Sequence, residues 1–269
     1  MNFSVKQKEN NVFEVYADDR LFTVCDYSAT YKRPFMGPVY APDGVSFTRF
    51  EPFHKEHPHQ RSLFIGVGDV NGVDFWNEYE DDKGVIVFDS VDEISEGDTA
   101  VVAVNTVWKK PDGTPVVNEN RRLTFSAAET GVRVDVRVVF TAAYGEVEFG
   151  ATKEAGPLGI RVNDFMRADK RGTFRNSEGG IKEKKCWGKE ALWCNYRGRK
   201  KGKLYGIAAF DRKTNERFPT TWHIRNYGLM AANNLFFKGG LSIPANENLQ
   251  YDYTVVFWTD SINEAEFSE

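Results

Sequence analysis

Short segments of alternating apolar and polar residues recur along almost the whole chain, separated by turn-forming residues. The pattern is clearest over residues 99–142, where TAVVAVNTVWK, NRRLTFSA and GVRVDVRVVFTA are rich in β-branched side chains. A Pro111-Asp112-Gly113 turn and a second turn at residues 127–131 separate these segments. Because a two-residue period places alternate side chains on opposite faces of a strand, we predict an antiparallel meander with one buried and one solvated face.

Helical patterns are scarce. No long segment combines helical periodicity with capping residues, and only residues 261–269 (SINEAEFSE) suit a short helical tail. The 269 residues contain no low-complexity linker and no repeat of solenoid length, and 41% hydrophobic residues are enough for a sizeable core. We therefore predict an all-β protein in which residues 1–269 form a single antiparallel β-sandwich domain.

Charge and apolar runs argue against two classes of partner. A formal net charge of -4 provides no basic face for nucleic acid, and no run reaches the roughly 18 apolar residues that span a bilayer. The amino-terminal residues lack the apolar stretch of a secretory signal, and Cys25, Cys186 and Cys194 lack metal or redox spacing. We expect a cytoplasmic protein with three structural thiols that binds neither nucleic acid nor membranes. Its oligomeric state is not indicated by the sequence.

The four histidines fall in two places. His54, His57 and His59 lie in PFHKEHPHQR, and His223 lies in TTWHIRNYG. In an extended backbone, which the intervening proline favours, His57 and His59 would share one face with Arg61. Imidazoles beside a guanidinium can hold a metal, a carboxylate or a sugar oxygen that becomes negative during a reaction. The alternative is a polar surface strand.

His223 and Arg225 are also two residues apart, so they too would share one strand face. We predict that this strand and the His57/His59 strand line one cleft. Lys153 and Glu154 are adjacent in an apolar stretch, so an extended backbone would turn at most one of them inward. Burial of Glu154 near histidines would suit it to proton transfer, and an exposed ion pair is the alternative.

Several segments place carboxylates and amides beside aromatic side chains, a combination that suits sugar recognition. SLFIGVGDVNGVDFW begins like a cation-binding loop but lacks the rest of an EF-hand, and a turn with a core tryptophan is the alternative. Residues 167–199 break strand periodicity, and we expect long loops there that form a wall of the cleft or a solvated connection. The substrate-binding candidates are Asp69, Asn71, Asp74, Trp76, Lys153, Asn176, Trp187, Trp193, Tyr196 and Tyr227.

Four segments resemble, in order, motifs of the bacterial family labelled "methane oxygenase PmoA-like": HPHQRSLFIGVGDVNGVDFW, ATKEAGPLGIRV, NSEGGIKEKKCWGKEALWCNYRG and PTTWHIRNYGLMAAN. The resemblance runs from about Lys32 to the last strands. It implies a galactose-mutarotase-like supersandwich and a genomic association with sugar oxidoreductases and isomerases, and it assigns no catalytic role to any residue. A membrane oxygenase subunit needs transmembrane helices, so we interpret the family label as a misannotation.

We predict a carbohydrate-active protein with a small-molecule carbohydrate as partner, and we favour an enzyme. It would act by general acid-base chemistry on a sugar or oxidised sugar, as an epimerase, lyase or hydrolase. The alternatives are a non-catalytic carbohydrate-binding domain and a metal-dependent enzyme that uses His57, His59 and His223. No cofactor is evident, and a divalent metal is left open. The catalytic candidates are His57, His59, Arg61, Glu154, His223 and Arg225.

Overall fold

The structure, a computed structural model, describes residues 1–50 and 56–267. Two eight-stranded antiparallel sheets make up the fold, which confirms the predicted all-β class. In spatial order, the first sheet consists of β1 (Phe3–Lys8), β2 (Val12–Ala17), β3 (Arg20–Asp26), β4 (Phe35–Met36), β5 (Leu63–Val67), β11 (Ala155–Arg161), β16 (Leu229–Ala232) and β15 (Trp222–Ile224).

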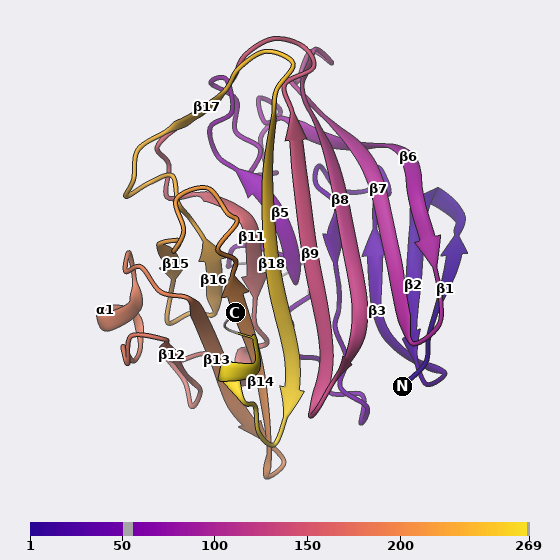
Figure 1. The fold of residues 1–269 in the computed structure, drawn as a ribbon, viewed down its shortest axis with the longest axis vertical. Helices are drawn as coiled ribbons and strands as arrows, with labels where there is room; N and C mark the ends of the chain where they lie inside the picture. Colours follow the sequence, from indigo (N-terminus) through magenta and orange to yellow (C-terminus); the bar gives the residue numbers. More distant parts are fainter. Residues whose placement is uncertain (51–55, 268–269) are drawn as a thin grey trace.

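The second sheet contains the longest strands, several of which Figure 1 shows side by side. In spatial order, its strands are β12 (Thr173–Asn176), β13 (Trp193–Lys200), β14 (Lys203–Asp211), β18 (Asn248–Thr259), β9 (Gly131–Thr141), β8 (Pro115–Ala128), β7 (Thr99–Lys109) and β6 (Val85–Ser95). The remaining elements are short: β10 (Val147–Phe149) pairs with β17 (Leu241–Ile243), and the helices are α1 (Glu183–Cys186) and the 3-10 turns η1 (Glu9–Asn11), η2 (Asp164–Met166) and η3 (Glu264–Phe267).

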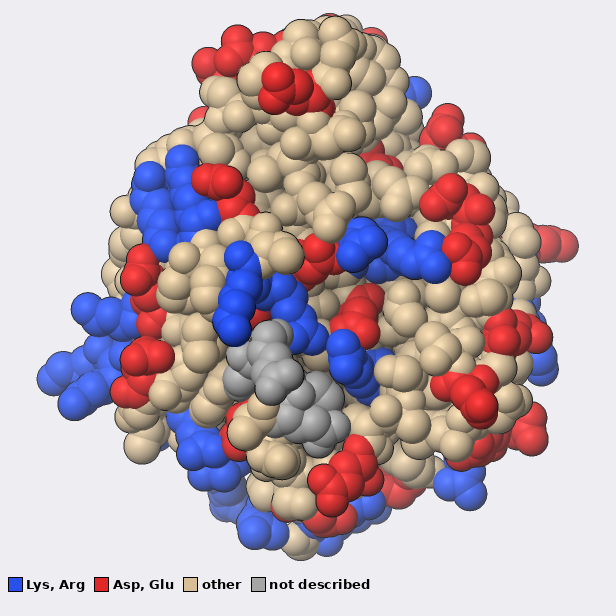
Figure 2. All heavy atoms as spheres, in the orientation of Figure 1, with Lys and Arg blue, Asp and Glu red and all other residues tan. Residues whose placement is uncertain are grey.

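The predicted meander is confirmed as β7, β8 and β9, paired in sequence order. Alternation of residue types explains this meander. In β9, Val132, Val134, Val136 and Val138 point into the core, while Arg133, Asp135 and Arg137 alternate with them on the opposite face. Arg137 pairs across to Asp252 of β18 at 2.7 Å. Figure 2 shows Lys and Arg side chains lying beside Asp and Glu side chains on the face that it draws.

The core lies between the two sheets. Phe22 of β3 makes edge contacts with Phe125 of β8 and Phe257 of β18, with ring centroids 6.2 and 5.9 Å apart. A smaller apolar cluster that includes Phe64, Trp76 and Leu229 packs separately from this core. Because β5 is buried along its whole length, loops must cover the outer face of the first sheet around it.

Two expectations need correction or completion. Residues 167–199 do not form one long loop, because β12, α1 and the first seven residues of β13 divide the segment into short connections. Basic and glycine residues hid these short elements from a search for periodicity. The predicted helical tail at residues 261–269 forms a 3-10 turn, η3.

Cys25, Cys186 and Cys194 are buried free thiols. In the described ranges, no helix has the length and apolarity that crossing a membrane requires.

Candidate functional site

A cavity of about 360 Å³ lies beside the smaller apolar cluster, in the size range of small-molecule sites. Histidines from both predicted motifs meet there, together with one carboxylate, two cations and two aromatic rings. We call this cavity the histidine pocket. Its lining residues are His57, His59, Gln60, Trp76, Asn77, Lys153, Glu154, His223, Arg225, Tyr227 and Leu229.

Strand register places His223 in the pocket. On β15, Trp222 and Ile224 belong to the core between the sheets, so His223 between them points to the opposite face. Its cross-strand partner on β16 is Ala231, which belongs to the smaller apolar cluster. His223 is 5% exposed. The strand predicted for this segment therefore presents its imidazole as expected.

His57 and His59 reach the pocket through a turn, which corrects the predicted extended strand. His57 has a positive φ of 49°, and its carbonyl accepts a hydrogen bond from the Gln60 backbone N–H at 3.0 Å. The two imidazoles are still neighbours, with ring centroids 6.0 Å apart. His54 lies outside the described residues.

Arg33 holds the His59 turn in place. Its Nη2 donates to the His59 carbonyl, and its Nη1 donates to the Trp76 carbonyl at 2.6 Å. The side chain is 2% exposed and forms an ion pair with Glu78 at 3.5 Å. Burial lowers the pKa of Arg33 to about 10, so the guanidinium remains charged at neutral pH. One buried cation thus joins two pocket walls that are separate in sequence.

Burial keeps the inner imidazoles neutral. Desolvation lowers the pKa of His59 to about 3, and the nearby cations of Arg33, Arg61 and Arg161 act in the same direction. For His223, burial lowers the pKa to about 4 against an opposing backbone hydrogen bond at Lys153. The Nδ1 atoms of both rings are buried and have no hydrogen-bond partner among the described residues. Such atoms are available to a ligand.

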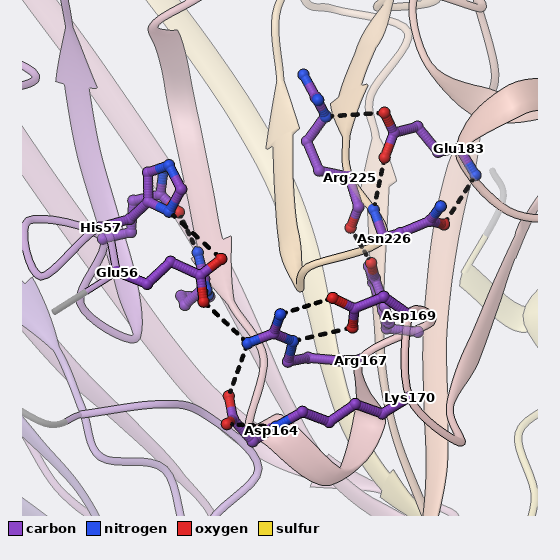
Figure 3. A network of polar contacts seen from close by, with 12 residues as sticks. Glu56, His57, Asp164, Arg167, Asp169, Lys170, Glu183, Arg225 and Asn226 are labelled. Atoms are coloured by element: carbon purple, nitrogen blue, oxygen red, sulfur yellow. Dashed lines mark hydrogen bonds and ion pairs between the residues drawn. The ribbon is translucent and has the colours of Figure 1, made fainter. Parts of the chain in front are cut away.

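The Arg225 wall is positioned by α1. Glu183 Oε1 forms an ion pair with Arg225 Nε at 3.0 Å, and Glu183 Oε2 accepts from the Asn226 backbone N–H at 2.8 Å. Figure 3 shows Glu183 clamping both residues. From the other side, the Tyr196 hydroxyl donates to the Arg225 carbonyl. Glu183 and Tyr196 are therefore positioning residues for Arg225.

Eight predicted residues line the pocket: His57, His59, Trp76, Lys153, Glu154, His223, Arg225 and Tyr227. Lys153 and Glu154 both do so, contrary to the expectation that at most one would face inward. They precede β11 in a bend rather than in a strand, and their charged atoms are 3.5 Å apart. The bend removes the alternation on which that expectation depended.

Arg61 is placed elsewhere than predicted. It is absent from the described lining of the pocket, forms an ion pair with Glu78, and lies over the Tyr31 ring at 4.2 Å. Three more candidates serve turns. Asp69 accepts from the Gly72 backbone, Asn71 bonds to the Glu146 and Glu148 backbones, and Asp74 accepts from the Trp76 and Asn77 backbones. The turn alternative therefore describes this loop.

The remaining candidates stand behind or away from the pocket. Trp187 packs edge-on to His223 with centroids 6.4 Å apart, and Tyr196 supports Arg225. Asn176 accepts from the Gly180 backbone, and Trp193 packs beside Phe210. Sequence reasoning missed Gln60, Asn77 and Leu229 in the lining, and also Arg33 and Glu183. Gln60, Leu229 and Glu183 lie inside the quoted sequence motifs, whereas Asn77 and Arg33 lie outside them.

The metal alternative lacks a ligand set in the described ranges, where no three His, Cys, Asp or Glu side chains gather as a metal site. A second, larger cavity of about 560 Å³ lies among strand ends, around Leu21, Phe22 and Val132. None of the histidines that the structure describes lines it, and apolar side chains contribute much of its wall. The histidine pocket therefore concentrates the groups with acid-base chemistry.

The chain matches a family described as a family of unknown function, DUF6807, over residues 13–269. It belongs to this family. No curated protein is significantly similar to this DUF6807 chain. Among solved structures, it aligns with the GH36 alpha-galactosidase AgaB of Geobacillus stearothermophilus at 9% identity and a TM-score of 0.47, over 94% of this chain and 41% of that one.

Two further structures align with the DUF6807 chain. The galactose mutarotase-like protein of Lactobacillus casei has 10% identity and a TM-score of 0.38, over 95% of this chain and 99% of that one. Heparan sulfate lyase HepC of Pedobacter heparinus has 10% identity and a TM-score of 0.40, over 97% and 36%. The chain thus spans less than half of the galactosidase and of the lyase. At these identities and TM-scores, the alignments indicate nothing about its substrate.

Proposed function

We propose that this chain is an enzyme that binds a sugar or oxidised sugar in the histidine pocket and transfers protons with His59 and His223. One observation carries the proposal: two buried imidazoles from distant segments line one cavity, and the Nδ1 of each has no hydrogen-bond partner among the described residues. A buried polar atom without a partner costs free energy, so its retention favours a role with a ligand.

The surroundings suit proton transfer next to a carbonyl or carboxyl group. A neutral imidazole accepts a proton, and a negatively charged ligand beside it would raise its pKa towards neutrality. Arg225 would stabilise the enolate or oxyanion that forms when a proton leaves carbon. Glu154, whose side chain is 38% exposed, can return a proton at the pocket mouth. Epimerisation and β-elimination both begin with such a step.

An exposed aromatic ring supports sugar binding. Tyr79 is 56% exposed, and its ring centroid lies 5.7 Å from that of His59. Sugars present a C–H face that packs on an aromatic ring while their hydroxyls bond to polar groups. Trp76 is 1% exposed, so its ring is part of the pocket wall and offers no open face on which a sugar could stack. Tyr79 lies outside the described lining of the pocket but beside His59, where its ring would offer a stacking surface to a bound sugar.

Proton transfer can be detected before the reaction is known. We would incubate the protein in D2O with a panel of neutral and oxidised sugars and follow carbon-bound protons by NMR. We expect exchange or conversion of at least one sugar, with loss of that signal in His59→Gln and His223→Gln. Lys184→Gln, an exposed change on α1, is the control. A sugar that binds without exchange or conversion would favour the non-catalytic binding domain instead.

A further inference from the structure

The histidine pocket carries more positive than negative charge. Lys153 and Arg225 line it directly, and Glu154 is the one carboxylate in its described lining. Glu154 is already paired with Lys153 at 3.5 Å. Behind the lining, Glu183 pairs with Arg225 Nε at 3.0 Å, and Glu56 pairs with Arg167 at 3.0 Å. Among the described residues, each lining cation has one carboxylate partner, and the Arg225 partner reaches only Nε from behind the wall.

Arg225 keeps its terminal nitrogens available. Glu183 engages Nε, and no hydrogen bond or ion pair joins either Nη to a described residue. Figure 3 shows these nitrogens pointing away from Glu183 and Asn226. A guanidinium that is oriented at Nε and open at both Nη atoms suits bidentate binding of a carboxylate. Glu183 thus orients the Arg225 guanidinium through Nε and leaves its two Nη atoms free to bind a ligand.

A third cation lies behind the wall. The Arg161 side chain is 0% exposed and lies over the Tyr227 ring at 4.6 Å. Its Nη1 donates to Gln60 Oε1 at 2.6 Å, while Nε and Nη2 have no hydrogen-bond partner among the described residues. Arg161 Nη2 lies 3.9 Å from Glu56 Oε2, which is too long for a hydrogen bond. A buried cation with such incomplete compensation favours a negative ligand nearby.

The same cations lower the pKa values of the pocket histidines. Beyond burial, the pKa of His223 is lowered by Arg225 and Lys153. The pKa of His57 is lowered by burial and then by Arg161, with Glu56 opposing. A ligand carboxylate would offset these cations directly. It would also stabilise the imidazolium cation that forms when an imidazole accepts a proton from the substrate.

We propose that the ligand of the histidine pocket is an acidic sugar, whose carboxylate lies against Arg225 and Lys153 while its hydroxyls bond to His59, His223 and Gln60. This inference rests on the proposed function of the pocket as a sugar site, and it adds the chemical class of the sugar.

The test compares matched pairs that differ in the carboxylate. Calorimetric titration would use D-glucuronate against D-glucose and D-galacturonate against D-galactose. We expect one acid to bind at least about tenfold more tightly than its neutral partner, with a preference that shrinks at high salt. Lys153→Gln combined with Arg225→Gln should reduce the preference to within about twofold. Lys184→Gln, an exposed cation outside the pocket, should leave it unchanged.

If the double variant fails to fold, Lys153→Gln alone can replace it, because the Lys153 side chain is half exposed and its change should leave the fold intact. This single change should still reduce the preference for the acid over its neutral partner. Equal binding of acid and neutral sugar would overturn the acidic-sugar inference and leave the sugar site standing. Tight binding of an acid without proton exchange in D2O would overturn the proposal that the chain is an enzyme, and it would leave the acidic-sugar inference standing. Tighter binding of glucose 6-phosphate than of either acid would overturn the carboxylate assignment, and no binding at all would overturn both proposals.

Discussion

The imidazole of His57 stacks on the phenol ring of Tyr227, with ring centroids 4.7 Å apart and planes at 5°. Arg161 also lies over the Tyr227 ring. This contact joins the turn before β5 to the turn between β15 and β16, so the two histidine motifs meet through an aromatic pair. The stack therefore belongs to the framework of the pocket.

The stack predicts an energetic coupling between His57 and Tyr227. Aromatic pairs contribute about 0.5–1.5 kcal/mol beyond their buried area. We expect His57→Gln and Tyr227→Leu to show a coupling of that size in a double-mutant cycle, measured by urea unfolding at pH 7.5. Tyr227→Phe, which keeps the ring, is the control and should retain the coupling. Additivity of the two changes would contradict the stacking contribution.

The buried neutral imidazoles predict sensitivity to acid. An unfolded histidine has a pKa near 6.5, whereas burial lowers the pKa of His59 in the folded chain to about 3. Between these values the unfolded state binds more protons, so the free energy of unfolding falls as the pH falls. The loss is about 1.4 kcal/mol per pH unit and begins below pH 6.5.

Replacement of His59 removes this contribution. From pH 7.5 to pH 5.0, we expect His59→Gln to lose about 2 kcal/mol less of its unfolding free energy than the wild type, measured by urea unfolding at each pH. His223→Gln should behave similarly, since its pKa near 4 lies well below pH 5. Identical losses in wild type and variants would show that these rings are not buried in neutral form.

Arg61 is predicted to stabilise the fold rather than to contact the ligand. It is 7% exposed and pairs with Glu78, which is also buried. Its replacement by methionine leaves a buried carboxylate with less compensation, at an expected cost of about 3 kcal/mol. Thermal unfolding should show the loss, while the folded fraction binds ligand as the wild type does. Wild-type stability with lost affinity would place Arg61 in the site instead.

Local patterns predicted the strands and the histidines but not the buried cations. Alternation in β7–β9 depends only on neighbouring residues, so it could be read directly. The roles of Arg33 and Arg161 depend on carbonyl and amide groups from distant segments, which leave no local signal. Arg61 was predicted in the site because an extended backbone was assumed, and the turn at His57 breaks that spacing. Membership of the PmoA-like family and the single-domain organisation stay predictions.

The most direct test of the central claim is to measure kcat and Kd together for His59→Gln and His223→Gln, on a sugar that the wild type converts. Glutamine retains size and hydrogen bonding but cannot accept the proton. We expect kcat to fall by roughly 10²–10⁴-fold while Kd changes far less, because a general acid or base contributes mainly in the transition state. Wild-type kcat in either variant would contradict the assignment of that imidazole to proton transfer.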